Sequence, residues 1–77
     1  IKNVRVTDKT QAQNDADVRA MVERAAKELG TDGRILVRES GTEPLVRVMV
    51  EAGNVETCEK YVDAVIDVIR SKGYVIE

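Results

Sequence analysis

The sequence predicts an α+β fold, with an antiparallel sheet of about four strands and two helices packed on one of its faces. Short segments alternate polar and apolar residues, whereas two longer segments repeat apolar residues every three to four positions. Glycine, asparagine and aspartate separate these segments. A chain of 77 residues supports one domain, so residues 1–77 are predicted to form a single domain. One shared interface between helices and sheet is the economical arrangement.

The first predicted strand is Asn3–Val6, where polar and apolar residues alternate. The polar residues 7–13 are expected to form a connector. Asn14 is expected to cap the first helix, because two aspartates would then lie in its first turn, where the helix dipole favours acids. Gly30 is well placed to end this helix. The apolar stripe of the helix consists of Val18, Met21, Val22, Ala25 and Leu29.

Two central strands are predicted at residues 34–38 and 45–51, with a turn at Asp32-Gly33 before the first. In the second strand, the valines at even positions share one face, and Leu45, Arg47, Met49 and Glu51 lie on the other. The connection between these strands, from Glu39 to Pro44, is then a hairpin loop.

The second helix is expected to begin after Asn54 and to end at Gly73. Cys58 lies on its apolar stripe and is therefore predicted to be a buried structural cysteine. Residues 74–76 are the candidate for a short fourth strand at the edge of the sheet. The apolar stripe consists of Cys58, Val62, Val65, Ile66 and Ile69.

Charge and composition limit the partners of the protein. The 12 basic and 14 acidic side chains give a net charge of −2, and the only aromatic residues are two tyrosines. Duplex binding usually needs a basic patch and single-strand binding needs stacking rings, so no nucleic-acid partner is expected. No apolar segment approaches the roughly 18 residues of a membrane span, so no membrane partner and a cytoplasmic location are expected. Histidine is absent and there is one cysteine, which leaves no internal disulfide and no Cys/His metal site.

Residues 38–47 are the candidate functional site, because this hairpin carries more chemistry than a turn requires. Arg38 and Arg47 stand at its two ends, and a guanidinium group matches the geometry of a phosphate. Ser40 and Thr42 each supply a hydroxyl donor. These residue types indicate a site for a phosphate monoester.

The other loop residues shape the backbone or oppose an anion. Gly41 lets the backbone approach a ligand closely, and Pro44 fixes the exit of the loop. Glu39 and Glu43 would repel an anion unless they face away or orient the arginines. On residue types alone, two alternatives stay open. One is a structural domain with an ordinary salt-bridged hairpin, and the other is a stand-alone module that binds a phosphorylated metabolite or phosphoprotein.

The string Arg-x-Ser-Gly-Thr-Glu-Pro-x-x-Arg-Val-Met at residues 38–49 follows Gly-Arg-Ile-Leu-Val at residues 33–37. It resembles the C-terminal domain of bacterial phosphoglucosamine mutases, which belong to the α-D-phosphohexomutase superfamily. The resemblance covers nearly the whole sequence and implies a TBP-like fold with a four-stranded sheet and two helices. Glucose and mannose relatives more often carry Asn at the position of Gly41. The amino-sugar branch is therefore favoured, with a phosphomannomutase or phosphoglucomutase domain as the alternative.

Carried over by position, the resemblance implies roles for seven loop residues. Glu43 and Pro44 match the motif as supporting residues. Glu39 falls at a variable position, where a neutral or basic residue is expected. The residues that would hold the substrate phosphate that is not transferred are Arg38, Ser40, Gly41, Thr42 and Arg47.

The resemblance also implies what lies outside these 77 residues. In the full-length enzymes, a phosphoserine in the first domain donates a phosphoryl group and a magnesium ion sits in the second. They interconvert glucosamine 6-phosphate and glucosamine 1-phosphate through a bisphosphorylated intermediate. The corresponding loops are absent here, so no catalytic residue and no Mg²⁺ ligand is predicted in this chain. The implied partners are a phosphorylated hexosamine and the other domains of the same polypeptide, and the isolated domain is expected to be inactive.

Overall fold

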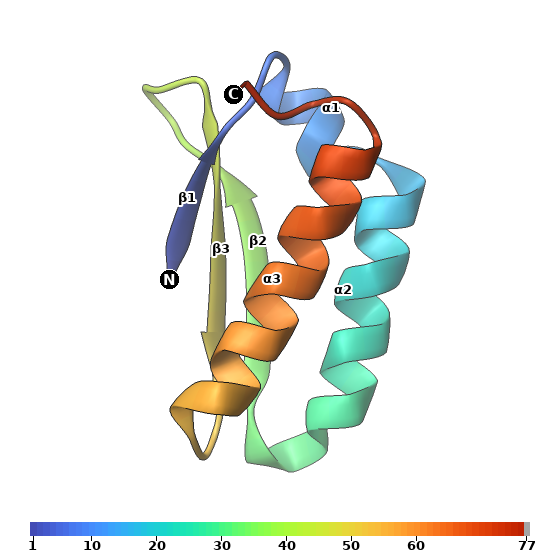
Figure 1. The fold of residues 1–77 in the computed structure, drawn as a ribbon, viewed down its shortest axis with the longest axis vertical. Helices are drawn as coiled ribbons and strands as arrows, with labels where there is room; N and C mark the ends of the chain where they lie inside the picture. The colour runs from blue at the N-terminus through green and yellow to red at the C-terminus, as the bar shows by residue number, and fades with distance from the viewer. Residues whose placement is uncertain (77) are drawn as a thin grey trace.

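The computed structural model describes residues 1–76 as an antiparallel sheet with its helices on one face (Figure 1). The strand order is β1-β3-β2, and α2 and α3 lie side by side against the sheet, which confirms the predicted α+β class (Figure 1). No helix within residues 1–76 is both long and apolar enough to cross a membrane. The elements in sequence order are β1 (Lys2–Arg5), α1 (Lys9–Asn14), α2 (Ala16–Leu29), the 3₁₀ turn η1 (Gly30–Asp32), β2 (Arg34–Glu39), β3 (Leu45–Glu51) and α3 (Val55–Ser71).

The core lies between the helices and one face of the sheet. The valines at even positions of β3, which share one face as predicted, are buried. Burying one such side chain contributes about 1.5–3 kcal/mol, so a small number of valines and isoleucines can hold the layers together. The largest fully buried side chains are Val6, Val18, Val46, Val48, Val65 and Ile69.

The register between β2 and β3 decides what each face of the sheet carries. Val37 pairs with Val48, and Arg38 pairs with Arg47. Because successive side chains of a strand point to opposite faces, the valine pair faces the helices and the arginine pair faces the open side. The sheet thus presents two cations side by side at the end nearest the β2–β3 loop.

The segment that follows α3 does not form the predicted fourth strand. Val75 makes a single antiparallel bridge with Val6, flanked by a hydrogen bond from the Ile76 N–H to the Arg5 carbonyl (3.0 Å). Among residues 1–76, this is the only β-bridge that the C-terminal segment forms, and a single bridge is too short to be a strand. The sheet therefore has three strands among the described residues, and the tail only covers the end of β1.

The predicted connector at residues 7–13 is wrong, because helix α1 occupies most of it. Asp8 caps this helix by accepting a hydrogen bond from the Gln11 N–H (3.0 Å), and Ala12 is fully buried. A six-residue helix with one apolar anchor shows no apolar periodicity, so the pattern on which helix prediction relies is missing.

The start of α2 also differs from the prediction by one residue. Asp15, not Asn14, is the cap, since its carboxylate accepts hydrogen bonds from the N–H groups of Asp17 (2.8 Å) and Val18 (3.2 Å). The same carboxylate accepts the hydroxyl of Tyr74 (2.6 Å). Asp15 therefore fastens the C-terminal tail to the beginning of α2.

The other predicted helix ends are confirmed. Asn54 caps α3 by accepting the Thr57 N–H (2.8 Å). Gly30 and Gly73 follow α2 and α3 with φ angles of 60° and 84°, a region that favours glycine. Cys58 packs against the core but is only partly buried, so the predicted burial is only partly confirmed; it lies in the first turn of α3, at the end of the helix.

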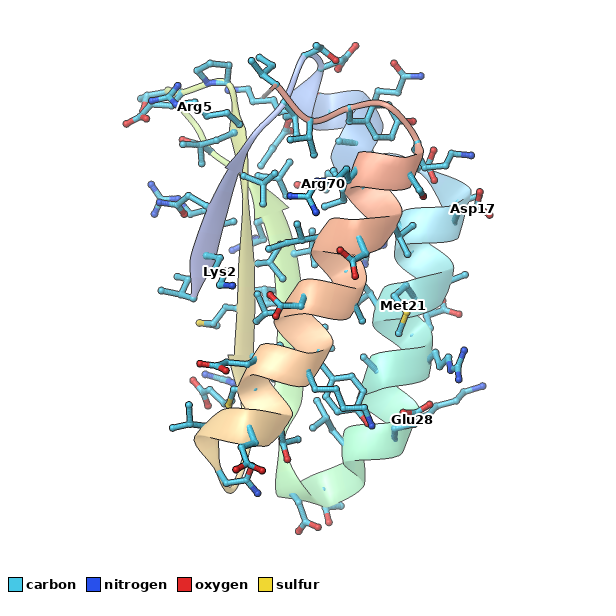
Figure 2. The ribbon with its side chains drawn as sticks, in the orientation of Figure 1. Lys2, Arg5, Asp17, Met21, Glu28 and Arg70 are labelled. Carbon is cyan, nitrogen blue, oxygen red and sulfur yellow. The ribbon has the colours of Figure 1, made fainter. Side chains whose placement is uncertain are left out.

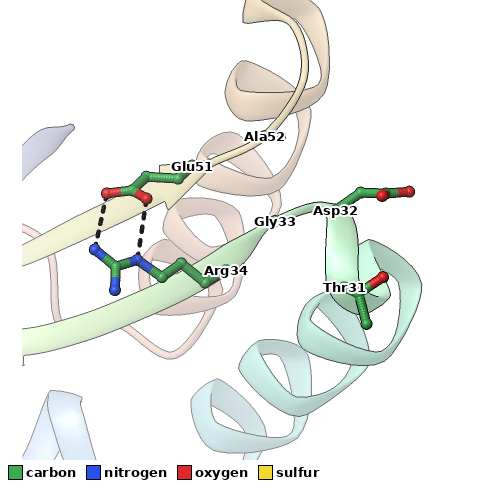
Figure 3. A pocket seen from close by; sticks show the side chains of 6 residues that line it. All are labelled: Thr31, Asp32, Gly33, Arg34, Glu51 and Ala52. Carbon is green, nitrogen blue, oxygen red and sulfur yellow. Dashed lines mark hydrogen bonds and ion pairs between the residues drawn. The ribbon is translucent and has the colours of Figure 1, made fainter.

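Gly33 joins η1 to β2 where the backbones of the two central strands come close (Figure 3). A Cβ atom at this position would collide with the backbone oxygen of Glu51 and would crowd the Leu29 side chain. The nearest of these atoms belongs to the backbone of β3, which cannot move aside as a flexible side chain could. A larger residue at position 33 must therefore displace the backbone.

Gly33→Ala is expected to lower the free energy of unfolding by about 1–3 kcal/mol, since it overpacks the junction between β2 and β3. Gly53→Ala is the matched control, because a Cβ there meets no atom within 4 Å and the φ angle is not positive. The loss of unfolded-state entropy is the same in both variants. Equal midpoints in urea for the two variants would contradict the predicted collision.

The Asp15–Tyr74 contact predicts a dependence of stability on pH. The Tyr74 hydroxyl, then the backbone N–H groups and the Lys72 ammonium, lower the pKa of Asp15 below its ordinary value. A carboxyl with a lowered folded-state pKa stabilises the fold above about pH 4, and this contribution is lost as the pH falls through the folded-state pKa. Tyr74→Phe is expected to be less stable than wild type at pH 7 and to approach it at pH 2. A stability difference that stays constant between these pH values would refute the coupling.

Candidate functional site

The loop between β2 and β3 is closed by its own hydrogen bonds. The Ser40 N–H donates to the Leu45 carbonyl (2.9 Å), and the Leu45 N–H donates to the Glu43 carbonyl (2.8 Å). Ser40 is only 4% exposed, and its Oγ accepts the N–H groups of Thr42 (3.3 Å) and Glu43 (3.2 Å). Ser40 thus holds the shape of the loop, and its hydroxyl hydrogen is left to donate.

Lys9 supports the loop from helix α1, a contribution that the sequence pattern did not predict. Its Nζ donates to the carbonyls of Ser40 (2.7 Å) and Glu43 (3.3 Å). These contacts join positions 31 and 34 residues apart, so no local pattern could have revealed them. The ammonium group places a positive charge directly behind the loop backbone.

Among residues 1–76, neither acid of the loop forms an ion pair with Arg38 or Arg47. The Glu39 carboxylate accepts the hydroxyl of Thr10 (2.5 Å) on α1. Glu43 forms an ion pair with Arg5 (3.6 Å), and Arg5 lies at the loop end of the molecule (Figure 2). Both carboxylates therefore have partners of their own.

Arg38 and Arg47 are the exposed cations of the site, directly opposite each other on neighbouring strands. In the part of the sequence that the structure describes, neither makes an ion pair or a side-chain hydrogen bond. Arg34, on the same face, donates to Glu51 from Nε (3.1 Å) and Nη2 (3.0 Å) (Figure 3). Like charges directly opposite on a sheet are unfavourable, so the Arg38–Arg47 pair costs stability unless an anion lies between them.

A surface depression gathers most of the predicted site residues. The structure brings Ser40 and Gly41 together with both arginines, whereas Thr42 is exposed further along the loop. Pro44 lies at the base, where its carbonyl accepts the Val6 N–H (3.0 Å) and ties the loop to the end of β1. The lining residues are Gln13, Arg38, Glu39, Ser40, Gly41 and Arg47.

A second depression, at the other end of the β2–β3 pair, has different chemistry (Figure 3). Among its lining residues the only cation, Arg34, is held by Glu51 through two hydrogen bonds, and Asp32 adds a further negative charge. An anion would find no unpaired cation among these lining residues. The depression at the β2–β3 loop is therefore the better candidate for an anionic ligand.

The fold and this loop define an α+β domain with an uncompensated cationic pair on its open sheet face. The sequence model described as "Phosphoglucomutase/phosphomannomutase, C-terminal domain" matches residues 1–68. The chain belongs to this family of domains. The match includes every predicted site residue.

Relatives with high sequence identity are bacterial phosphoglucosamine mutases. The protein of that name from Lachnospira eligens is 78% identical over 76 residues, which are 99% of this chain and 17% of the relative. Those from Lachnoclostridium phytofermentans and Bacillus subtilis are 55% and 53% identical over 95% and 91% of this chain. The 77 residues thus span about a sixth of the length of these relatives and correspond to one domain of such an enzyme.

Lys9→Met is expected to loosen the loop, because it removes two charge-assisted hydrogen bonds to loop carbonyls. We expect the free energy of unfolding to fall by about 1.5 kcal/mol and the Thr42 and Glu43 amides to exchange faster with solvent. Lys27→Met, at an exposed position in the last turn of α2, removes the same charge and is the control. Unchanged exchange at both loop amides would show that Lys9 does not support the loop.

Proposed function

We propose that the Arg38–Arg47 pair and the adjoining loop bind the phosphate group of a phosphorylated hexosamine. The observation that carries the proposal is the pair itself, two arginines directly opposite each other on neighbouring strands with no carboxylate partner in residues 1–76. A phosphate dianion between them would replace repulsion with two forked, charge-assisted interactions. The names of the relatives favour an amino-sugar phosphate as the substrate.

The loop adds neutral donors to the two cations. Ser40 has a hydroxyl hydrogen to donate, because its oxygen already accepts two backbone N–H groups. No atom lies within 4 Å of a Cβ built on Gly41, so a ligand can approach the backbone there. Thr42 would donate its hydroxyl from the exposed side of the loop. Such small, separate donors suit a tetrahedral anion that can arrive from different directions.

In the whole enzyme, this domain would hold the phosphate that is not transferred. The reaction would interconvert glucosamine 6-phosphate and glucosamine 1-phosphate in the cytoplasm through a bisphosphorylated intermediate. The intermediate would reverse its orientation within the active site. The phosphate site of this domain must therefore accept a phosphate from either end of the sugar. A phosphoserine in another domain would donate the phosphoryl group.

The chemical step itself is assigned to other domains. Ser40 is buried, its oxygen accepts backbone N–H groups, and the sequence has no histidine to act as its base, so it is no nucleophile. Among the described residues, no three His, Cys, Asp or Glu side chains come together as a metal site. In the whole enzyme, magnesium would be held by residues of another domain.

Titration of the domain with glucosamine 6-phosphate, followed by amide NMR, tests the proposal. We expect saturable shifts at residues 40–42 with a dissociation constant on the order of millimolar, and no such shifts with glucosamine. Arg38→Ala and Arg47→Ala are each expected to weaken binding about tenfold or more, since each removes charge-assisted hydrogen bonds.

Arg34→Ala is the matched control, because it removes the same charge from the same sheet face without touching the site. Its dissociation constant is expected to stay within about twofold of wild type, since an exposed charge at that distance is largely screened. An equal loss of binding affinity in all three arginine variants would mean that the effect comes from net charge and not from a specific site. An absence of localised shifts up to roughly tens of millimolar would refute the phosphate site in this domain.

A further inference from the structure

Gln13 lines the candidate phosphate site from helix α1, outside the loop motif. Its Oε1 accepts the backbone N–H of Glu39 at 2.6 Å. Strand β2 lies at the edge of the sheet, and this N–H points away from β3. Gln13 therefore satisfies a donor that the strand ladder leaves unpaired.

This contact fixes which way the amide of Gln13 is turned. A backbone N–H is a donor, so the side-chain atom that faces it must be the oxygen. The other position on the amide carbon is then the NH₂ group, which carries two donor hydrogens. Within residues 1–76 the Gln13 NH₂ group donates to no protein atom, and the contact to the Glu39 N–H is the only hydrogen bond of this side chain.

We infer that the side-chain NH₂ of Gln13 is a further hydrogen-bond donor to the phosphate bound at Arg38 and Arg47, an inference that rests on the proposed function. With its oxygen engaged, the Gln13 amide is left only with donors, so it recognises an acceptor such as a phosphate oxygen. Being neutral, it adds a donor without increasing the repulsion between the two guanidinium groups. Helix α1 thereby becomes part of the binding site.

Side-chain amide NMR during titration of the domain with glucosamine 6-phosphate observes this donor directly. We expect the Gln13 NH₂ signals to shift with the same saturation curve as the Gly41 backbone amide. The NH₂ signals of Gln11 and Asn14, exposed on the same helix, serve as internal controls and are expected to stay in place.

A pair of variants tests whether the ligand lies against this position of α1. Gln13→Glu keeps an oxygen for the Glu39 N–H but replaces the NH₂ donor with a charged oxygen that repels phosphate, and is expected to raise the dissociation constant about tenfold or more. Asn14→Asp adds the same charge to the same helix but outside the depression. This variant is expected to change the dissociation constant by about twofold at most. A dispersed amide spectrum verifies that both variants fold.

Two results separate failure of this inference from failure of the proposed function. If the Gly41 amide shifts while the Gln13 NH₂ signals do not, and Gln13→Glu binds like Asn14→Asp, Gln13 is not a ligand donor and the phosphate site stands. If the wild-type loop shows no localised shift up to roughly tens of millimolar, the phosphate site fails and the inference falls with it.

Discussion

The register of the β2–β3 hairpin is the constraint on which the rest of this domain depends. It pairs Val37 with Val48 under the helices and Arg38 with Arg47 on the open face. A slip of one residue would exchange the two faces, so the core and the cationic pair are set together. Each buried valine contributes about 1.5–3 kcal/mol, whereas an unfavourable cross-strand pair costs about 0.2–1 kcal/mol. The core therefore holds the two arginines together against their repulsion.

Helix α1 turns this hairpin into a defined site. Lys9 fastens the loop carbonyls, Thr10 draws the Glu39 carboxylate to the helix, and Gln13 occupies the free edge of β2. Among residues 1–76, the acidic residue next to Arg38 makes no ion pair with it. A short polar segment that looks like a linker in the sequence thus controls the electrostatics of the loop.

The sequence predicted the features that are local or periodic. The two central strands, the cap at Asn54 and the glycines that end the long helices follow from apolar spacing and turn residues. Helix α1 has one apolar anchor and no period, so its pattern predicts a connector instead. The loop residues stood out by chemical type and by family resemblance. The roles of Lys9 and Gln13 depend on tertiary contacts across 26 or more residues, which no local pattern encodes.

The central claim is that Arg38 and Arg47 repel each other unless an anion joins them, and a double-mutant cycle in unfolding free energy tests it most directly. Arg38→Met, Arg47→Met and the double variant would be unfolded by urea with and without inorganic phosphate. The account predicts an unfavourable coupling energy without phosphate and a favourable one with saturating phosphate, because the ligand stabilises the fold through both side chains. A coupling energy of the same sign and size under both conditions would contradict it.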